Sequence, residues 1–171
     1  MTKPASPNAP YVWRSFTEWT SPWPDGGAPQ GIRVDRQGNI WFDQEGSVCA
    51  VGRLDTAEDK NMFTFWTLNP DSACTRGGID LDLDAEDKVR SVWFTYGHGQ
   101  IRRLDPITNQ ITAWVTPGLN PSIAVDSSGA ADQLRNVYFT DSAGNTIGQI
   151  NPIANKYTSW TIPTSSKSSR C

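Results

Sequence analysis

Short apolar runs alternate with polar turns along most of the chain. One kind of run, such as Ile40-Trp-Phe42, is continuously apolar, which is typical of a strand buried on both faces. A second kind alternates: in Phe63-Thr-Phe-Trp66, Thr and Trp fall on one side of an extended strand. The pattern therefore predicts short β-strands of two types, a buried inner type and an outer type with one covered side.

These runs recur with a constant period, and the outer type returns every 46–48 residues. Its copies are Phe16–Trp19, Phe63–Trp66, Ile111–Trp114 and Tyr157–Trp160. Between them recur Ile32–Asp35, Ile79–Asp82 and Ile123–Asp126; then Ile40–Phe42, Val92–Phe94 and Val137–Phe139; then Val51–Asp55, Ile101–Asp105 and Ile147–Asn151. Four β-branched or aromatic strands in a period of this length are the signature of a β-propeller blade. We therefore predict an all-β protein of blades with four antiparallel strands each: three full blades and one outer strand, an incomplete ring unless another chain completes it.

The turns support the same interpretation. Asp105–Asn109 and Asn151–Asn155 place Pro where a type I turn needs its restricted φ, between a third and a fourth strand. A generic antiparallel sandwich would also alternate, but four copies in phase argue against it. We expect a flexible arm over residues 1–10, the blade array over 11–163 and a disordered tail over 164–171.

Composition narrows the classes of function. Hydrophobic residues make up 37% and charged residues 19% of the chain, and the net charge of -3 offers no field for nucleic acid. No apolar stretch is long enough to span a membrane, and residues 1–10 lack the apolar region of a signal peptide. The location therefore stays open: cytoplasmic, or periplasmic or extracellular if a leader has been removed.

The three cysteines follow no CxxC spacing, so the sequence gives no support for zinc or redox chemistry. Cys49 and Cys74 fall in loops that open on the same face of adjacent predicted blades, so the pair could reach bonding distance. A disulfide there would argue for an oxidising compartment. A run of acidic residues favours a solvated hairpin over a calcium site, because the run lacks the loop glycine of a calcium motif. That run is Asp80, Asp82, Asp84, Glu86 and Asp87, and we predict no metal site.

With these strings in view, the chain resembles the streptogramin (virginiamycin B) lyase repeat family. A blade of that family reads approximately F-T-E-W, then G-P-H-G-I-x-x-D-x-x-G-N-I-W-F-T-E, then I-G-R-L-D-P. Phe16–Trp19, Gly31–Phe42 and Val51–Asp55 match it closely, and the resemblance covers about residues 11–163. The resemblance implies a propeller whose one face carries a general acid/base pair, a His and a Glu or second His, and a divalent cation, usually magnesium. The implied reaction is an elimination that opens a cyclic depsipeptide.

Most positions to which the resemblance assigns chemistry are substituted here. The motif His is Gln30, Gly78 and Ser122 in the three repeats, and the motif Glu is Gln44, Tyr96 and Asp141. The single histidine, His98, falls in the loop between the second and third strands of the second blade, where a solvent-facing polar role is the alternative to a base. The candidate catalytic residues are therefore His98, Tyr96 and Glu45, and the candidate ligand-face residues are Gln30, Gln44 and Asp141.

Two functions from different classes follow. The first is a non-catalytic propeller module that binds a protein or serves as a structural subunit, and it needs no cofactor. The second is a magnesium-dependent lyase completed by other blades or copies. An open arc exposes an apolar blade face at each end, so we expect a protein partner, further copies of the chain or further blades of a longer polypeptide.

Overall fold

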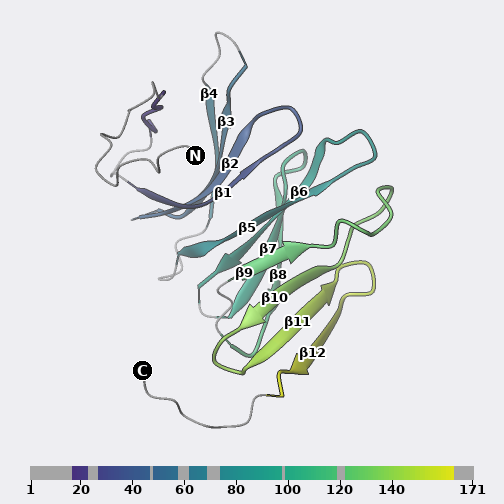
Figure 1. Ribbon diagram of the computed structural model, residues 1–171. Helices are drawn as coiled ribbons and strands as arrows, with labels where there is room; N and C mark the ends of the chain where they lie inside the picture. Colours follow the sequence, from purple (N-terminus) through teal and green to yellow (C-terminus); the bar gives the residue numbers. More distant parts are fainter. Residues whose placement is uncertain are drawn as a thin grey trace, which may run out of the picture.

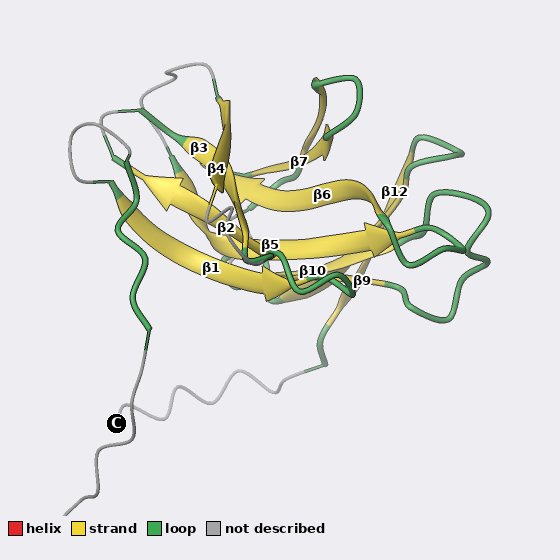
Figure 2. Cartoon of the chain, turned by 90° about the horizontal axis from the view of Figure 1, so that it is seen from above, coloured by secondary structure: helices red, strands yellow, loops and turns green. Residues whose placement is uncertain are grey.

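The computed structural model describes residues 17–22, 27–46, 48–57, 62–68, 74–97, 99–118 and 122–163, and of residues 75–77 only the backbone. This part of the chain contains strands and loops (Figure 2), so it includes no helix that could cross a membrane. The predictions for residues 1–10 and 164–171 lie outside the described residues.

Three four-stranded antiparallel sheets form the molecule, and each sheet follows the chain from strand to strand. Blade 1 consists of β1 (Ala28–Val34), β2 (Ile40–Glu45), β3 (Ala50–Asp55) and β4 (Met62–Thr67). Blade 2 consists of β5 (Thr75–Leu83), β6 (Val89–Tyr96), β7 (Gln100–Asp105) and β8 (Gln110–Val115). Blade 3 consists of β9 (Ser122–Val125), β10 (Val137–Asp141), β11 (Thr146–Asn151) and β12 (Lys156–Thr161). The blades follow one another as an open arc (Figure 1), which confirms the predicted all-β propeller architecture.

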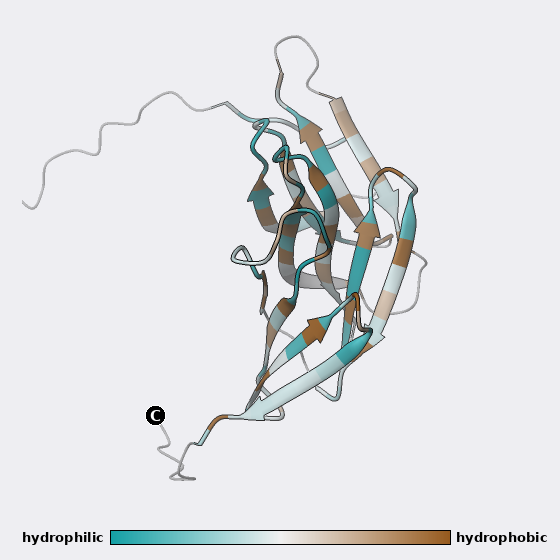
Figure 3. Ribbon diagram, turned by 90° about the vertical axis from the view of Figure 1, so that its right-hand side faces the viewer, coloured by the Kyte–Doolittle hydropathy of each residue, from teal (hydrophilic) through white to brown (hydrophobic). Residues whose placement is uncertain are grey.

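The second strand of each blade carries two neighbouring aromatic residues, which point to opposite faces because side chains alternate along a strand. Bands of hydrophobic and hydrophilic residues follow one another along the strands (Figure 3). In blade 1, Trp41 faces blade 2 and Phe42 faces away from it. Trp41 stacks on Trp66 with the ring centroids 5.4 Å apart, and Trp41 joins a buried cluster with Ile79 and Phe94 of blade 2. The first part of the core is therefore the seam between blades 1 and 2.

The seam between blades 2 and 3 repeats this arrangement. Trp93 stacks on Trp114 at a centroid distance of 5.0 Å, and Trp93 packs in a buried cluster with Ile123 and Phe139 of blade 3. The apolar core of the molecule thus consists of two seams built from the same repeat positions. This explains why the second strands are apolar at consecutive positions.

The outer-strand tryptophans join each blade to the next one. The indole N–H of Trp66 donates to Oδ1 of Asn109 at 2.7 Å, and that of Trp114 donates to Oδ1 of Asn155 at 2.8 Å. Both asparagines lie in turns with left-handed backbone, φ 60° and 48°, a conformation that Asn tolerates better than most residues. One residue therefore closes the turn and accepts the indole of the preceding blade.

A bulge marks the innermost strand of blades 1 and 2. The β1–β2 register shifts between Pro29 and Ile32, and there the N–H of Gly31 donates to the carboxylate of Asp43. In blade 2 the N–H of Gly78 donates to Oγ1 of Thr95 at 3.3 Å. In both blades, the residue that follows the aromatic pair of the second strand accepts the N–H of the bulge. This residue is Asp43 in blade 1 and Thr95 in blade 2.

The predicted additional outer strand differs from the structure, in which residues 17–22 form no strand. Phe16, where that strand was expected to begin, lies outside the described residues. An outer strand pairs with the third strand of its own blade, and the three sheets leave none for this segment. In the described part of the chain, residues 17–22 belong to none of the three sheets, so their composition alone does not make them a strand.

Candidate functional site

The candidate residues lie where the second strands of the blades end. Gln44 and Glu45 end β2, Tyr96 ends β6 and Asp141 ends β10. His98 lies outside the described residues, so its proposed role stays a prediction. The other candidates share one end of the sheets but belong to three different blades.

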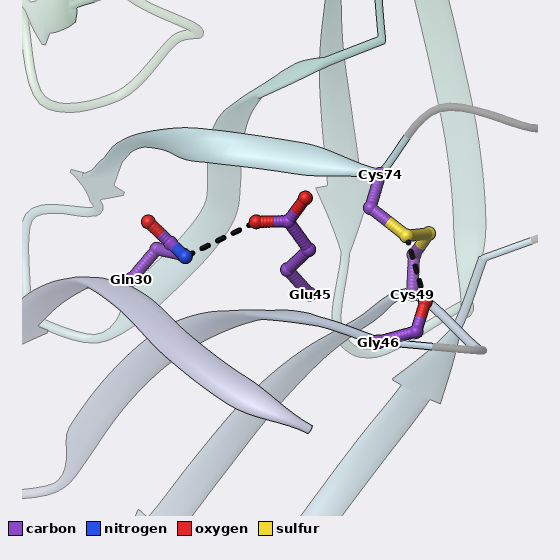
Figure 4. The surroundings of a disulfide bond; sticks show 5 residues. All are labelled: Gln30, Glu45, Gly46, Cys49 and Cys74. Carbon is purple, nitrogen blue, oxygen red and sulfur yellow. Dashed lines mark hydrogen bonds between the residues drawn. A yellow bond between two sulfur atoms is a disulfide. The ribbon is translucent and has the colours of Figure 1, made fainter. Parts of the chain in front are cut away.

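Gln30 and Glu45 are two candidates that a hydrogen bond brings together. Nε2 of Gln30, on β1, donates to Oε2 of Glu45 at 3.1 Å, and both side chains are exposed (Figure 4). Nearby, Sγ of Cys74 lies 3.3 Å from the carbonyl oxygen of Gly46. The Glu45 carboxylate is therefore accessible, and among the described residues its hydrogen-bond partner is a neutral amide.

Gln44 lies close to Gly27, just before β1. It is fully buried, and among the described residues its amide nitrogen and oxygen have no hydrogen-bond partner. Gly27 passes so close that a Cβ there would lie 2.2 Å from the amide nitrogen of Gln44. Gln44 shares the strand face of Phe42, because the two are two positions apart.

Tyr96 is also buried, in the cluster between blades 1 and 2. The guanidinium carbon of Arg102 lies 3.5 Å from the centroid of the Tyr96 ring, a cation–π contact. Nε of Arg102 donates to Oε1 of Gln100 at 3.0 Å. The face of the Tyr96 ring is thus occupied by a positive charge, which disfavours a metal cation beside it.

Asp141 is buried as well and serves the turn between β10 and β11. Its Oδ1 accepts the N–H groups of Ala143 and Gly144, each at 3.0 Å. A Cβ at Gly118 would lie 2.0 Å from the Asp141 carboxylate, so the loop from blade 2 passes directly over it. These contacts commit the carboxylate to the local backbone.

The alternation of side chains along a strand explains how Gln44, Tyr96 and Asp141 are oriented. Gln44, Tyr96 and Asp141 follow Phe42, Phe94 and Phe139 by two positions, so each faces the blade side and not a common centre. The described residues contain no group of three or more His, Cys, Asp or Glu that could hold a metal ion. The donors at these positions therefore do not fit the magnesium site that the lyase alternative requires, and a ligand-binding role for them stays a prediction.

A disulfide joins blades 1 and 2 at the same end of the sheets. Cys49, before β3, and Cys74, before β5, are bonded, with their Cα atoms 5.3 Å apart (Figure 4). The corresponding positions at the second seam are Gly99 and Gly118, and a Cβ at Gly99 would lie 2.8 Å from the Gly118 carbonyl oxygen. The predicted proximity of the two cysteines is confirmed, and the second seam replaces the covalent link by close backbone contact.

Each carboxylate of the acidic run contacts an N–H donor or a basic side chain of the protein. Asp80 binds Nε of Arg33 at 2.9 Å and accepts the N–H of Val125 at 2.7 Å, which ties the innermost strands of all three blades together. Asp82 lies 3.2 Å from Arg90, and burial raises the pKa of its carboxyl group although Arg90 and Arg135 act to lower it. The remaining acids, Asp84, Glu86 and Asp87, contact the N–H of Lys88, Nζ of Lys88 and Nε of Arg36, respectively.

The most unusual surface is one that the sequence analysis did not assign to named residues. We call it the leading face: the side of blade 1 turned away from blade 2, made of Ile32, Val34, Ile40, Phe42, Leu54 and Phe63. Ile32 is 58% and Val34 64% exposed, whereas Ile79 and Ile123, which match Ile32 in the repeat, are 1% and 6% exposed. Trp19 and Ser21 lie beside this face and enclose with it a groove of about 320 Å³. The signal in the sequence was the repeat itself, which places these apolar residues on a face that no other blade covers within the described residues.

The comparisons with known proteins support the fold and go no further. No protein-family model matches the sequence, and no curated protein matches it. A chain in the crystal structure of a nidogen/laminin complex is similar in structure, with a TM-score of 0.58 at 15% sequence identity. The match covers 78% of this chain and 47% of the other, so the chain spans about half of that neighbour's length. At this identity the similarity shows the shared fold alone.

Proposed function

We propose that the chain is a non-catalytic propeller module that binds a protein partner through the leading face. The observation that carries this proposal is the exposure of Ile32 and Val34 on a face whose repeat equivalents are buried between blades. Apolar patches of this kind on a folded protein usually mark an interaction site. The structural neighbour is part of a complex between two proteins, which is compatible with such a role.

The streptogramin lyase alternative has weaker support. An elimination needs a base that removes a proton α to a carbonyl, and an electrophile that stabilises the resulting enolate. Glu45 is exposed and hydrogen-bonded to Gln30, but Tyr96 and Asp141 are buried and engaged by other protein groups. The chemistry would therefore depend on His98 and on groups from another blade or copy.

A direct assay separates the two functions. The full chain is incubated with a type B streptogramin and magnesium, and the linearised product is sought by mass spectrometry. We expect no product above the rate of a protein-free control. Ring opening that disappears in a His98→Ala variant would overturn the proposed non-catalytic function.

Site-specific photocrosslinking tests the binding surface. A photoreactive amino acid replaces Val34 on the leading face or Ile153, which is 59% exposed in a turn of blade 3 and provides a matched control. In extracts of the source cells, protein adducts should form with the Val34 probe and be much weaker with the Ile153 probe. Equal labelling by both probes would contradict a binding role for the leading face.

The disulfide bears on the location. Structural disulfides persist in oxidising compartments and are rare where thiols are kept reduced. The Cys49–Cys74 bond therefore favours a periplasmic or extracellular module over a cytoplasmic one.

A further inference from the structure

The arc ends in two different faces. A face of each kind is also buried at the seams between blades. At one end lies the leading face of blade 1. At the other end lies what we call the trailing face of blade 3, the side turned away from blade 2. The trailing face contains Ala124, Tyr138, Ile147, Gln149, Thr158 and Trp160, which the strand register places on one side of the sheet.

Both internal seams join a trailing face to a leading face. At the first seam, Trp41 and Trp66 of blade 1 pack against Ile79 and Phe94 of blade 2. At the second seam, Trp93 and Trp114 of blade 2 pack in the cluster that contains Ile123 and Phe139 of blade 3. The repeat positions are the same at both seams, so any trailing face of this type can pack against any leading face in the same way.

The two terminal faces carry the same positions without a covering blade. On the leading face, Ile32 and Phe42 match the Ile and Phe that receive a tryptophan at each seam. On the trailing face, Trp160 matches the tryptophans that are inserted, yet its side chain is 50% exposed. Within the described part of the chain, no acceptor lies at its indole nitrogen, whereas Trp66 and Trp114 each have an asparagine.

The groove on the leading face accommodates an indole. Trp19 is among the residues that line it, and the repeat aligns Trp19 with Trp66 and Trp114. An indole from a preceding outer strand therefore suits this position. On docking, Trp160 of another chain would take the place that Trp19 holds.

We infer that the partner of the leading face is a second copy of this chain, joined head to tail through its trailing face. This inference rests on the proposed function and names its partner. Two arcs of three blades would make a ring of six, within the range of about four to eight blades that closes a propeller. Two identical seams related by a twofold axis would cover both exposed faces at once.

The mass of the full chain in solution is the first test. One copy has a mass of 18.9 kDa, and we expect native mass spectrometry and sedimentation equilibrium to give twice this value. Ile32→Glu on the leading face and Trp160→Glu on the trailing face should each weaken the dimer at least about tenfold in Kd, because each places a charge in both seams. Ile153→Glu is the matched control and should leave the mass unchanged.

Mixing the two single variants gives the sharper test. A head-to-tail dimer of one Ile32→Glu chain and one Trp160→Glu chain has one unaltered seam and one seam with both changes. This mixed dimer should therefore form at lower concentration than either variant forms a dimer alone. A face-to-face dimer of two leading faces would instead be weakened by Ile32→Glu alone and would ignore Trp160→Glu.

Several results would overturn the inference. These are a monomer at concentrations up to about 100 μM, insensitivity to Trp160→Glu, or open-ended polymers in place of a closed dimer. Near-ultraviolet circular dichroism and an intact disulfide establish that each variant folds; Val34→Lys replaces Ile32→Glu if the latter does not. A monomer whose leading face still crosslinks to another protein would contradict self-assembly and leave the proposed function standing. Lyase turnover by a dimer would contradict the proposed non-catalytic function and leave self-assembly standing.

Discussion

The leading faces of blades 1 and 2 carry nearly the same residues, but the apolar residues of their innermost strands lie in opposite environments. Ile32, Val34 and Phe42 on blade 1 match Ile79, Leu81 and Phe94 on blade 2 by repeat position. Ile79 and Phe94 are buried in the first seam, while Ile32 and Val34 are mostly exposed. Among the described residues, a trailing face with two stacked tryptophans covers blade 2, and no such face covers blade 1.

This difference shows that the neighbouring blade determines whether the side chains on a blade face are buried. Within a blade, the hydrogen-bonded ladder and the alternation of side chains determine which residues share a face. Whether that face is core or surface depends on the neighbouring blade. An apolar leading face without a neighbour is thus a docking surface made from core residues.

The largest effect should come from breaking the covalent part of the first seam. Cys49 and Cys74 are 25 residues apart, and closing a loop of this size stabilises a protein by about 3.5 kcal/mol on the chain-entropy model. The double variant Cys49→Ala and Cys74→Ala should lose about this much free energy of unfolding in urea denaturation. Cys171→Ala serves as the control and should have no effect, and equal stability of all three proteins would contradict the structural role of the bond.

Truncating the matched isoleucines tests the comparison itself. Ile79→Ala should lower the free energy of unfolding by about 3 kcal/mol, because it leaves a cavity in a packed seam. Ile32→Ala, at the exposed equivalent position, should change it by less than about 0.5 kcal/mol. Both are measured by urea denaturation in dilute protein, where a second copy does not contribute. Similar losses for the two variants would show that the leading face of blade 1 is covered in the single chain.

The outer-strand tryptophans allow a smaller version of the same test. Trp66→Phe removes the indole N–H that binds Asn109 and should cost about 1 kcal/mol of unfolding free energy. Trp160→Phe, on the trailing face, should be close to neutral in dilute protein. If Trp160→Phe costs as much as Trp66→Phe, the indole of Trp160 has a partner within its own chain.

The smallest effect concerns a turn outside the faces compared above. The N–H of Lys88, and then that of Glu86, donate to Asp84 and hold the pKa of its carboxyl below the ordinary value. The ionised form is therefore favoured by folding: its contribution is present above about pH 4 and is lost as the pH falls through the lower folded-state pKa. Asp84→Asn should reduce the loss of stability between about pH 4 and pH 2, measured by urea denaturation across this range. An unchanged pH profile would contradict this role of Asp84.

Much of the fold was predictable from the sequence because its signals are local and repeated. The apolar pair Trp41 and Phe42, the Pro-containing turns and the outer Phe63–Trp66 type recur with one period, and each blade forms where they predict it. The segment around Trp19 was the exception: its composition predicts a strand, but no third strand is available to pair with it.

The candidate site was less predictable. Gln44, Tyr96 and Asp141 were selected because they replace one motif position, and the structure buries each of them. The contacts that occupy them, such as Arg102 over Tyr96 and the turn N–H groups on Asp141, come from loops and neighbouring strands. A motif position names a residue, but only its surroundings determine whether the group is free to react.

By itself, the sequence determined the strands, their repeat, the two faces of each blade and the loops that hold Cys49 and Cys74. These follow from side-chain alternation and turn chemistry, which act within a few residues. Only the tertiary structure decided that the cysteines are bonded, that Trp66 and Trp114 find asparagines in the next blade, and that Ile79 is core while Ile32 is surface. Burial and pairing between blades depend on segments far apart in the chain, and the same local pattern meets a neighbour at two seams and solvent at the ends.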